Sequence, residues 1–245
     1  MKTLVLLFLS GLVCSAQIAI TGNARLTGNI FLGQTNPPAG GGGLAAFSDD
    51  FNRANSSALG ANWSEDDPDL DIFSNTLRIV DGSGSYPPTL AIYNTATTTV
   101  NQYVQFTVAT SGGYPVIALR YADASSAYYQ IEFDATTAYW SHVASVGGTA
   151  TAIANGAFSG IAAGEIVSVT ITGTGTGTVI RLWKGMTSGS LPSAADIWAG
   201  DNTPDLSFTT DPASPVNTGN KVGLGGSQAT ANTEQLDNFY GGDVP

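Results

Sequence analysis

The sequence predicts an all-β protein built as a two-sheet antiparallel sandwich. Of the 245 residues, 30 are Gly, and Thr, Ser and Ala are abundant, a composition that favours strands and tight turns over helices. From residue 76 onward, short runs of alternating apolar and polar residues are separated by Gly, Asn, Asp, Ser and Pro. The chain is 42% hydrophobic and only 11% charged, which excludes a disordered chain. We therefore expect one large β-domain with almost no helix.

The first 16 residues have the features of a signal peptide. Lys2 precedes an apolar run at 4–9, and Cys14-Ser-Ala16 has the small-x-small pattern of a signal-peptidase site. Neither this run nor any later one reaches the roughly 20 apolar residues that a membrane-spanning helix needs. We therefore expect a secreted, extracellular protein that starts at Gln17. A lipid anchor on Cys14 is the alternative, but Gly-Leu-Val before it does not resemble a bacterial lipobox.

Residues 17–34 stand apart from the rest of the chain. Their apolar residues alternate with small polar ones, and the Pro-Pro and Gly-rich stretch at 35–45 follows as a linker. The segment is either an unstructured N-terminus or a strand that adds to the sheet edge of another subunit. The second reading predicts self-association through 17–34.

The strands of the main domain are expected in regular succession. Short spacings between them predict that consecutive strands are antiparallel neighbours. Residues 173–177 form a loop, and 185–220 form a longer one with at most a helical turn at 192–198. The expected ranges are 76–80, 89–94, 102–109, 116–122, 127–134, 138–144, 149–154, 165–172, 178–184, 221–226 and 234–240.

Residues 47–63 predict a short strand followed by an ordered turn, and they contain the pattern D-x-F-x-R…L-G-x-x-W, from Asp49 to Trp63. Near the C-terminus, the Gly-rich run 221–226 precedes Leu236-Asp-Asn-Phe239. Together these motifs resemble the concanavalin A-like, laminin G-like domains of bacterial secreted and phage-associated proteins. The resemblance covers about 47–243 and implies a jelly-roll sandwich over 46–245. It leaves function open, because this fold carries lectins, adhesins, glycosidases and spacers.

The composition of the chain limits the classes of molecule that it is expected to bind. The net charge of −11, from 19 acidic and 8 basic residues, disfavours nucleic acid and anionic lipid, since no basic patch could neutralise phosphates. One histidine and no cysteine after residue 16 cannot supply a standard zinc site. Phosphate-binding loop motifs are missing as well. Cations and neutral polymers are the better candidates.

Calcium is the metal that the resemblance implies. Many such sandwiches bind one ion where the first and last strands meet, and Asp237 matches the carboxylate used there, with Asp50 as second donor. The alternative is that Asp237 caps a turn or bonds the neighbouring backbone. The acidic stretch 65–71 lacks the Gly and Glu of an EF-hand loop and predicts a solvated turn.

Related sandwiches also include retaining glycosidases with a strand motif similar to E-[ILV]-D-x-x-E. Glu132-Phe-Asp134 matches its first half, but Thr137 stands in place of the second Glu. The sequence therefore predicts no enzyme. Glu132 either binds a sugar hydroxyl or is an ordinary solvated strand residue.

A binding face is expected on adjacent strands, where alternation places polar and aromatic side chains on one side. Such a mixture suits sugars, because rings stack on pyranose faces and polar groups bond hydroxyls. A register shifted by one residue would bury some of them instead. The candidates are Tyr103, Gln105, Arg120, Tyr128, Gln130, Glu132, Trp140 and His142.

These observations predict a secreted, non-catalytic binding module, carbohydrate-binding or adhesive, for a polysaccharide or cell-surface glycan. A structural subunit of an extracellular filament or surface layer, linked through 17–34, is the alternative. A degenerate glycoside hydrolase is the third reading.

Overall fold

The computed structural model describes residues 46–65, 69–80, 88–134, 136–159, 161–186, 204–209, 212–227 and 234–244. The predicted signal peptide at 1–16, strand segment at 17–34, linker at 35–45 and helical turn at 192–198 lie outside these residues. Those four predictions therefore stay predictions.

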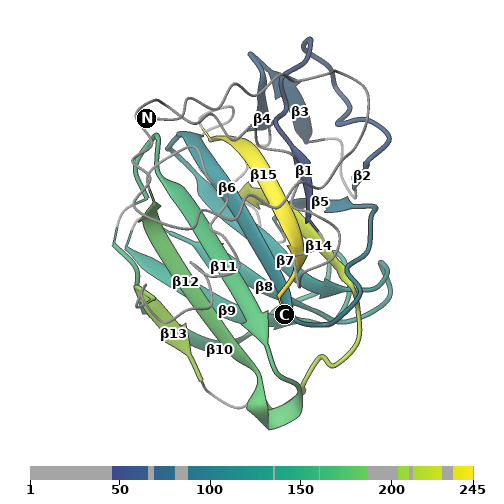
Figure 1. Ribbon diagram of the computed structural model, residues 1–245, viewed down its shortest axis with the longest axis vertical. Coiled ribbons are helices and arrows are strands. Elements are labelled where there is room, and N and C mark those ends of the chain that lie inside the picture. The colour runs from purple at the N-terminus through teal and green to yellow at the C-terminus, as the bar shows by residue number, and fades with distance from the viewer. Residues whose placement is uncertain are drawn as a thin grey trace, which may run out of the picture. The chain divides into compact units, whose positions relative to one another are not determined.

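The described strands form two antiparallel sheets, which Figure 1 shows as two layers. The eight-stranded sheet has the order β13-β12-β11-β6-β15-β4-β3, with β1 paired to β15. Its strands are β1 (Ala46–Asp49), β3 (Leu70–Phe73), β4 (Thr76–Ile79), β6 (Gln102–Thr110), β11 (Ile166–Thr172), β12 (Val179–Met186), β13 (Leu206–Phe208) and β15 (Gln235–Asp243).

The seven-stranded sheet has the order β10-β9-β8-β7-β14-β5-β2. A single 3-10 turn, Gly175–Gly177, joins β11 to β12 and is the one helical element in the described part of the chain. The seven strands are β2 (Trp63–Glu65), β5 (Thr89–Tyr93), β7 (Tyr114–Tyr121), β8 (Tyr128–Phe133), β9 (Thr137–Val143), β10 (Ala150–Ala157) and β14 (Lys221–Ser227).

One apolar core fills the space between the sheets. Alternation along β6 and β8 turns Val104, Phe106 and Val108 of one sheet toward Ile131 and Phe133 of the other, as the sequence predicted. Burial of such side chains is the main source of stability in a domain without disulfides. The predicted two-sheet antiparallel jelly-roll sandwich is confirmed, and with it the resemblance to concanavalin A-like domains at the level of architecture.

All eleven predicted ranges overlap a strand, but the expectation that consecutive strands pair is wrong for some of them. The chain crosses between sheets from β4 to β5, from β5 to β6, from β6 to β7, from β10 to β11 and from β14 to β15, whereas β7 to β10 do form a meander. Alternation of apolar residues is the same whichever sheet a strand joins. Sequence spacing alone therefore cannot separate a hairpin from a crossover.

β3 lies partly inside the stretch predicted as a solvated acidic turn. Leu70 and Ile72 of this strand are buried, whereas Asp71 between them binds Arg78 of the neighbouring β4, with Arg78 Nε 2.9 Å from Asp71 Oδ1. The acidic residue is thus half of a cross-strand ion pair. β13, inside the predicted long loop, was also missed; it has three residues and pairs only with β12.

The Gly-rich character of β14 has a steric cause. This strand lies between β7 and β5, and a Cβ at Gly225 would sit 2.0 Å from the carbonyl oxygen of Thr89. No side chain fits so close to a neighbouring backbone. The motif therefore reports strand packing and not a ligand loop.

Candidate functional site

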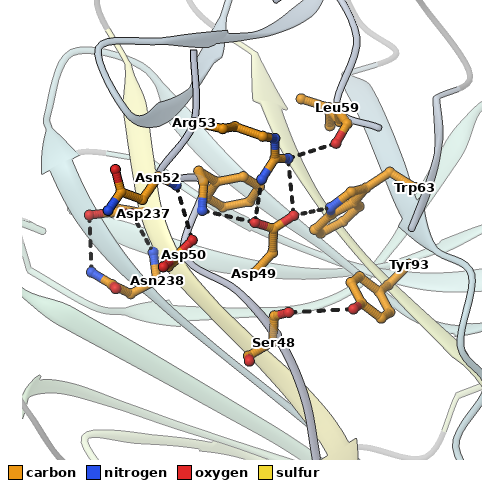
Figure 2. A network of polar contacts seen from close by, with 11 residues as sticks. Ser48, Asp49, Asp50, Asn52, Arg53, Leu59, Trp63, Tyr93, Asp237 and Asn238 are labelled. Atoms are coloured by element: carbon orange, nitrogen blue, oxygen red, sulfur yellow. Dashed lines mark hydrogen bonds and ion pairs between the residues drawn. The ribbon is translucent and has the colours of Figure 1, made fainter. Parts of the chain in front are cut away.

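The opening segment is a structural network centred on Asp49 (Figure 2). Arg53 donates two hydrogen bonds to the Asp49 carboxylate, at 2.6 and 3.1 Å, and the Trp63 indole and the Phe51 backbone N–H each donate one at 2.8 Å. Burial disfavours the charged form, but these four donors outweigh it and lower the pKa of Asp49. Arg53 also donates to the Leu59 carbonyl oxygen at 2.6 Å. The motif that carried the resemblance thus maintains the fold.

Aromatic rings complete this network. The Trp63 ring centroid lies 4.8 Å from Phe239 and 5.0 Å from Tyr93, and Phe47 stacks on Tyr93 at 4.6 Å. These contacts join β1, β2, β5 and β15, so they connect both sheets at one place. Aromatic pairs of this geometry add stability beyond the area that they bury.

The two predicted calcium ligands lie close to this network (Figure 2). The pKa of Asp237 is raised, first by burial and then by the negative charges of Asp50 and Asp49, so these carboxylates repel one another. A cation would relieve that repulsion. The alternative reading is also present, because Asp237 accepts the backbone and side-chain N–H groups of Asn238 at 2.8 and 3.0 Å.

Two carboxylates are only part of a calcium site, which takes six to eight oxygens. In the described ranges, no group of three or more His, Cys, Asp or Glu side chains is arranged to hold a metal. The residue that follows each predicted ligand has a positive φ: 48° for Asn238 after Asp237, and 50° for Phe51 after Asp50. Asn tolerates this left-handed region better than Phe does. Calcium binding by Asp50 and Asp237 fits the carboxylates present and stays a prediction.

The predicted binding face is not one surface, and this expectation is wrong. Tyr103 and Gln105 lie on β6 in the eight-stranded sheet, whereas the other six candidates belong to β7, β8 and β9 of the seven-stranded sheet. Both side chains are also buried, and the Gln105 amide donates to the Ser168 hydroxyl at 2.8 Å. The cause is the crossover between β6 and β7, which the sequence does not reveal.

Arg120 points into the protein, although alternation placed it outside. A bulge in the pairing of β7 with β14 gives this residue a φ of 55° and shifts the alternation by one residue. The fully buried guanidinium donates to the carbonyl oxygens of Val100, Val216 and Gly173, at 3.0 Å and 2.8 Å for the first two. Burial lowers the pKa of Arg120 to about 10. Arg120 therefore ties three loops together at one end of the sandwich.

Trp140 and His142 do not join an outer face either. Trp140 is fully buried in the core, with its ring 5.3 Å from Tyr129. His142, two residues further along the same strand, is half-buried on the same side. Replacing Trp140 by Ala would cost about 3–5 kcal/mol. It would test stability and not binding.

Three of the predicted residues do share the outer face of β8. Tyr128, Gln130 and Glu132 alternate with core residues, but Tyr128 and Gln130 are almost fully buried there. Tyr128 packs with Tyr121 and Val143 in a second apolar cluster on this face. Only Glu132 opens onto a groove.

That groove, of about 520 Å³, is the candidate functional site. It lies over the outer face of β8, β9 and β10 and continues past Tyr114 at the start of β7. Tyr114, 36% exposed, is the one large hydrophobic side chain that is exposed in the described part of the chain. The groove is lined by Tyr114, Glu132, Asp134, Tyr139, Ser141, Thr149, Ala150 and Ala152.

The two carboxylates of the groove differ electrostatically. Burial raises the pKa of Glu132, and the charge of Asp134 adds to the rise. Asp134 has a lowered pKa: burial acts against ionisation, but the N–H groups of Thr136 and Thr137 and the Tyr139 hydroxyl outweigh it. Tyr139 donates to Asp134 at 3.0 Å, so its ring is held beside Glu132, its cross-strand neighbour.

A second hollow, of about 330 Å³, adjoins the groove, since Tyr114 and Asp134 line both. Its apolar walls come from Val108, Pro115, Phe133 and Ile161. Glu234, just before β15, also lines it, although its side chain is shielded from water. We call this hollow the end cavity.

The glycosidase motif is not formed as one strand. β8 ends at Phe133, and Asp134 then accepts the N–H groups of Thr136 and Thr137 at 2.7 Å in a turn that leads into β9. Thr137 belongs to β9 and not to the strand that carries Glu132. The position of the second carboxylate in the motif is thus occupied by a hydroxyl on another strand.

Sequence reasoning missed Tyr114, Tyr139 and Glu234. Tyr139 pairs with Glu132 across β8 and β9, and this register could have been found from the short loop between the two predicted strands. Tyr114 follows Gly112 and Gly113, a turn signal before a strand. Glu234 carried no signal, because its partners are more than 120 residues away in the chain.

No protein-family model matches this chain, and no curated protein matches it. Solved structures do. A carbohydrate-binding module from Bacillus subtilis is 10% identical over 74% of this chain and 93% of its own, with a TM-score of 0.45. A legume lectin-like domain from Entamoeba histolytica is 8% identical over 75% and 91%, with a TM-score of 0.46. An endo-1,3-beta-glucanase from Streptomyces sioyaensis is 11% identical over 85% and 100%, with a TM-score of 0.44.

Binding proteins and enzymes are thus found among these structures, and scores below 0.5 do not choose between them. The fold assignment rests on the strand order of this chain itself. Within the described residues, no helix is long and apolar enough to cross a membrane.

Proposed function

We propose that this protein is a secreted, non-catalytic carbohydrate-binding module whose ligand lies in the groove over β8, β9 and β10. The observation that carries the proposal is the lining of the groove, which combines Tyr114 and Tyr139 with the carboxylates of Glu132 and Asp134. Tyrosine rings offer apolar faces to pyranose C–H groups, and carboxylates accept hydrogen bonds from sugar hydroxyls. Neutral polysaccharide or a cell-surface glycan fits a chain with a net charge of −11.

The non-catalytic part of the proposal is supported by the groove chemistry. Retaining hydrolysis needs two carboxyl groups about 5–5.5 Å apart, one as nucleophile and one as acid. Asp134 is occupied by three hydrogen bonds from its own turn and Tyr139, and Thr137 offers only a hydroxyl. Glu132 is then left to bind a hydroxyl.

The test is a glycan array followed by titration of β-1,3-glucan, β-1,4-glucan and β-1,4-N-acetylglucosamine hexamers. Tyr114→Ala and Tyr139→Ala should each weaken the tightest of these complexes about 5- to 10-fold, the loss expected for one aromatic contact. Tyr240→Ala is the matched control, because Tyr240 is a half-buried tyrosine on β15 of the other sheet.

Equal affinity of the wild type and both groove variants would contradict the proposed site. Release of shorter sugars by the wild type, lost in Glu132→Gln, would contradict the non-catalytic assignment. Self-association through 17–34, as a filament or surface-layer subunit would require, stays a prediction because that segment lies outside the described residues.

A further inference from the structure

The turn between β6 and β7 is held by one buried carboxylate. Glu234 Oε2 accepts the backbone N–H groups of both Gly112 and Gly113, each at 2.8 Å. The backbone carbonyl of Glu234 accepts the Ile79 N–H at 3.2 Å, which anchors the residue on β4. A turn at one end of the sandwich is thereby joined to the residue just before β15.

This turn determines where Tyr114 lies. Tyr114 directly follows the two glycines and lines both the groove and the end cavity. Glycine has the least restricted backbone of all residues, so a Gly-Gly turn depends on its hydrogen bonds for a fixed conformation. The Glu234 carboxylate supplies two of them.

We propose that Glu234 is a proton-operated latch: its protonation favours the closed Gly112-Gly113 turn and keeps Tyr114 in position beside the glycan groove. The second half of this inference rests on the proposed function, whereas the first half does not. Glu234 is a positioning residue, because it is shielded from solvent and acts on the ligand only through Tyr114.

The direction follows from the cost of burying charge. Burial raises the pKa of Glu234 to about 7, while the N–H groups of Gly113 and Gly112 oppose the rise. Opening of the turn would let water reach the carboxylate and return its pKa toward the usual value of 4.5. Protonation therefore favours the closed turn, and this preference is lost as the pH rises from about 4.5 to about 7.

The titratable groups on the surrounding elements do not reverse the direction of the pKa shift of Glu234. Tyr114 and Asp134 line the end cavity, Arg78 lies on β4, and Asp237 follows on β15. Arg78 is engaged by Asp71. Burial raises the pKa of Glu234 against the opposing effect of the two amide hydrogen bonds, and none of these neighbouring groups contributes to the shift.

Amide hydrogen exchange tests the first half of the inference in the full chain. In the wild type, the protection factors of Gly112 and Gly113 should be at least 10-fold lower at pH 8 than at pH 5.5. In Glu234→Gln, which keeps an acceptor oxygen without titrating, they should not depend on pH. Thr98 and Thr99 are the control, because Asp243 holds their N–H groups at 2.8 and 2.7 Å on another part of the sandwich.

Protection of Gly112 and Gly113 that is unchanged between the two pH values in the wild type would overturn the latch. The same would follow if Glu234→Gln kept the full pH dependence. A parallel change at Thr98 and Thr99 would mean global loosening, which also contradicts a local latch.

The second half is tested by titrating the tightest-binding hexamer at both pH values. Affinity should fall several-fold from pH 5.5 to pH 8 in the wild type and stay constant in Glu234→Gln. His142→Gln should retain the fall, because His142 lines neither the groove nor the end cavity. If the protection of Gly112 and Gly113 depends on pH as expected but the affinity for the hexamer stays constant, the link to Tyr114 is overturned. If no hexamer binds at all, both the proposed function and this link are contradicted. The exchange measurement then still decides whether Glu234 holds the turn.

Discussion

Asp49 and Glu234 are both carboxylates that accept several N–H groups inside the sandwich, yet their pKa values move in opposite directions. Asp49 is lowered by Arg53, Trp63 and the Phe51 backbone in spite of burial, whereas Glu234 is raised to about 7 with two backbone N–H groups. A guanidinium and an indole thus stabilise a carboxylate at one place, and two amides fail to offset burial at the other. The first arrangement maintains the fold, and the second keeps a proton equilibrium near neutral pH.

The largest expected effect on stability is at Asp49, where the hydrogen bonds outweigh the cost of burial. Asp49→Ala removes four accepted hydrogen bonds and leaves Arg53 and Trp63 without their acceptor, so it should lower the free energy of unfolding by about 3 kcal/mol. Asp71→Ala is the control, since its ion pair with Arg78 lies near the surface and should cost about 1 kcal/mol or less. Urea unfolding measures both. A loss no greater than that of Asp71→Ala would mean that the network does not stabilise the fold.

Glu234→Gln should stabilise the fold at pH 8, in contrast to Asp49→Ala, and the size of this effect should depend on pH. A pKa raised from 4.5 to about 7 means that ionisation destabilises the folded state, with a limit of roughly 3 kcal/mol at full ionisation. Stability of the wild type should therefore fall as the pH rises from about 4.5 to about 7. We expect the variant to be about 1–2 kcal/mol more stable than the wild type at pH 8 and equal to it or weaker at pH 5. Urea unfolding of the wild type and of Glu234→Gln between pH 5 and pH 8 measures this difference. If the variant is not the more stable protein at pH 8, ionisation of Glu234 does not destabilise the folded state.

The smallest expected effect on stability is at Asp237, and it depends on whether calcium is present. Asp237 lies beside the network around Asp49 but has a raised pKa. Without calcium, Asp237→Asn removes the repulsion from Asp50 and should change stability by less than about 1 kcal/mol, in the stabilising direction. With calcium, the wild type alone should gain melting temperature by mass action. Thermal unfolding with chelator and with calcium measures both. An equal calcium response in the variant would exclude a site that uses Asp237.

Local patterns predicted the elements well because they depend on near neighbours. The alternation in β6 and β8, the turn at 173–177 and the Gly-rich strand were all readable from single stretches of sequence. The opening motif also had a readable role, since the Asp49, Phe51 and Arg53 contacts lie within a few residues of one another.

The predicted site failed where long-range pairing decides position. The crossover between β6 and β7 separated Tyr103 and Gln105 from the other candidates, and one bulge turned Arg120 inward. Of the eight predicted ligand residues, Glu132 alone lines the groove. Asp134 lies two residues after Glu132 in the chain, whereas Tyr114 comes from the start of β7 and reaches the groove only because β7 pairs with β8.

The sequence by itself determined the all-β class, most of the strand ranges and the packing of apolar side chains into a core, because period-two alternation is a property of each strand alone. Only the tertiary structure decided which sheet each strand joins, which way Arg120 points and that Glu234 meets Gly112 and Gly113. Those outcomes depend on hydrogen bonds between residues far apart in the chain, and burial of a carboxylate by distant strands is what moves its pKa.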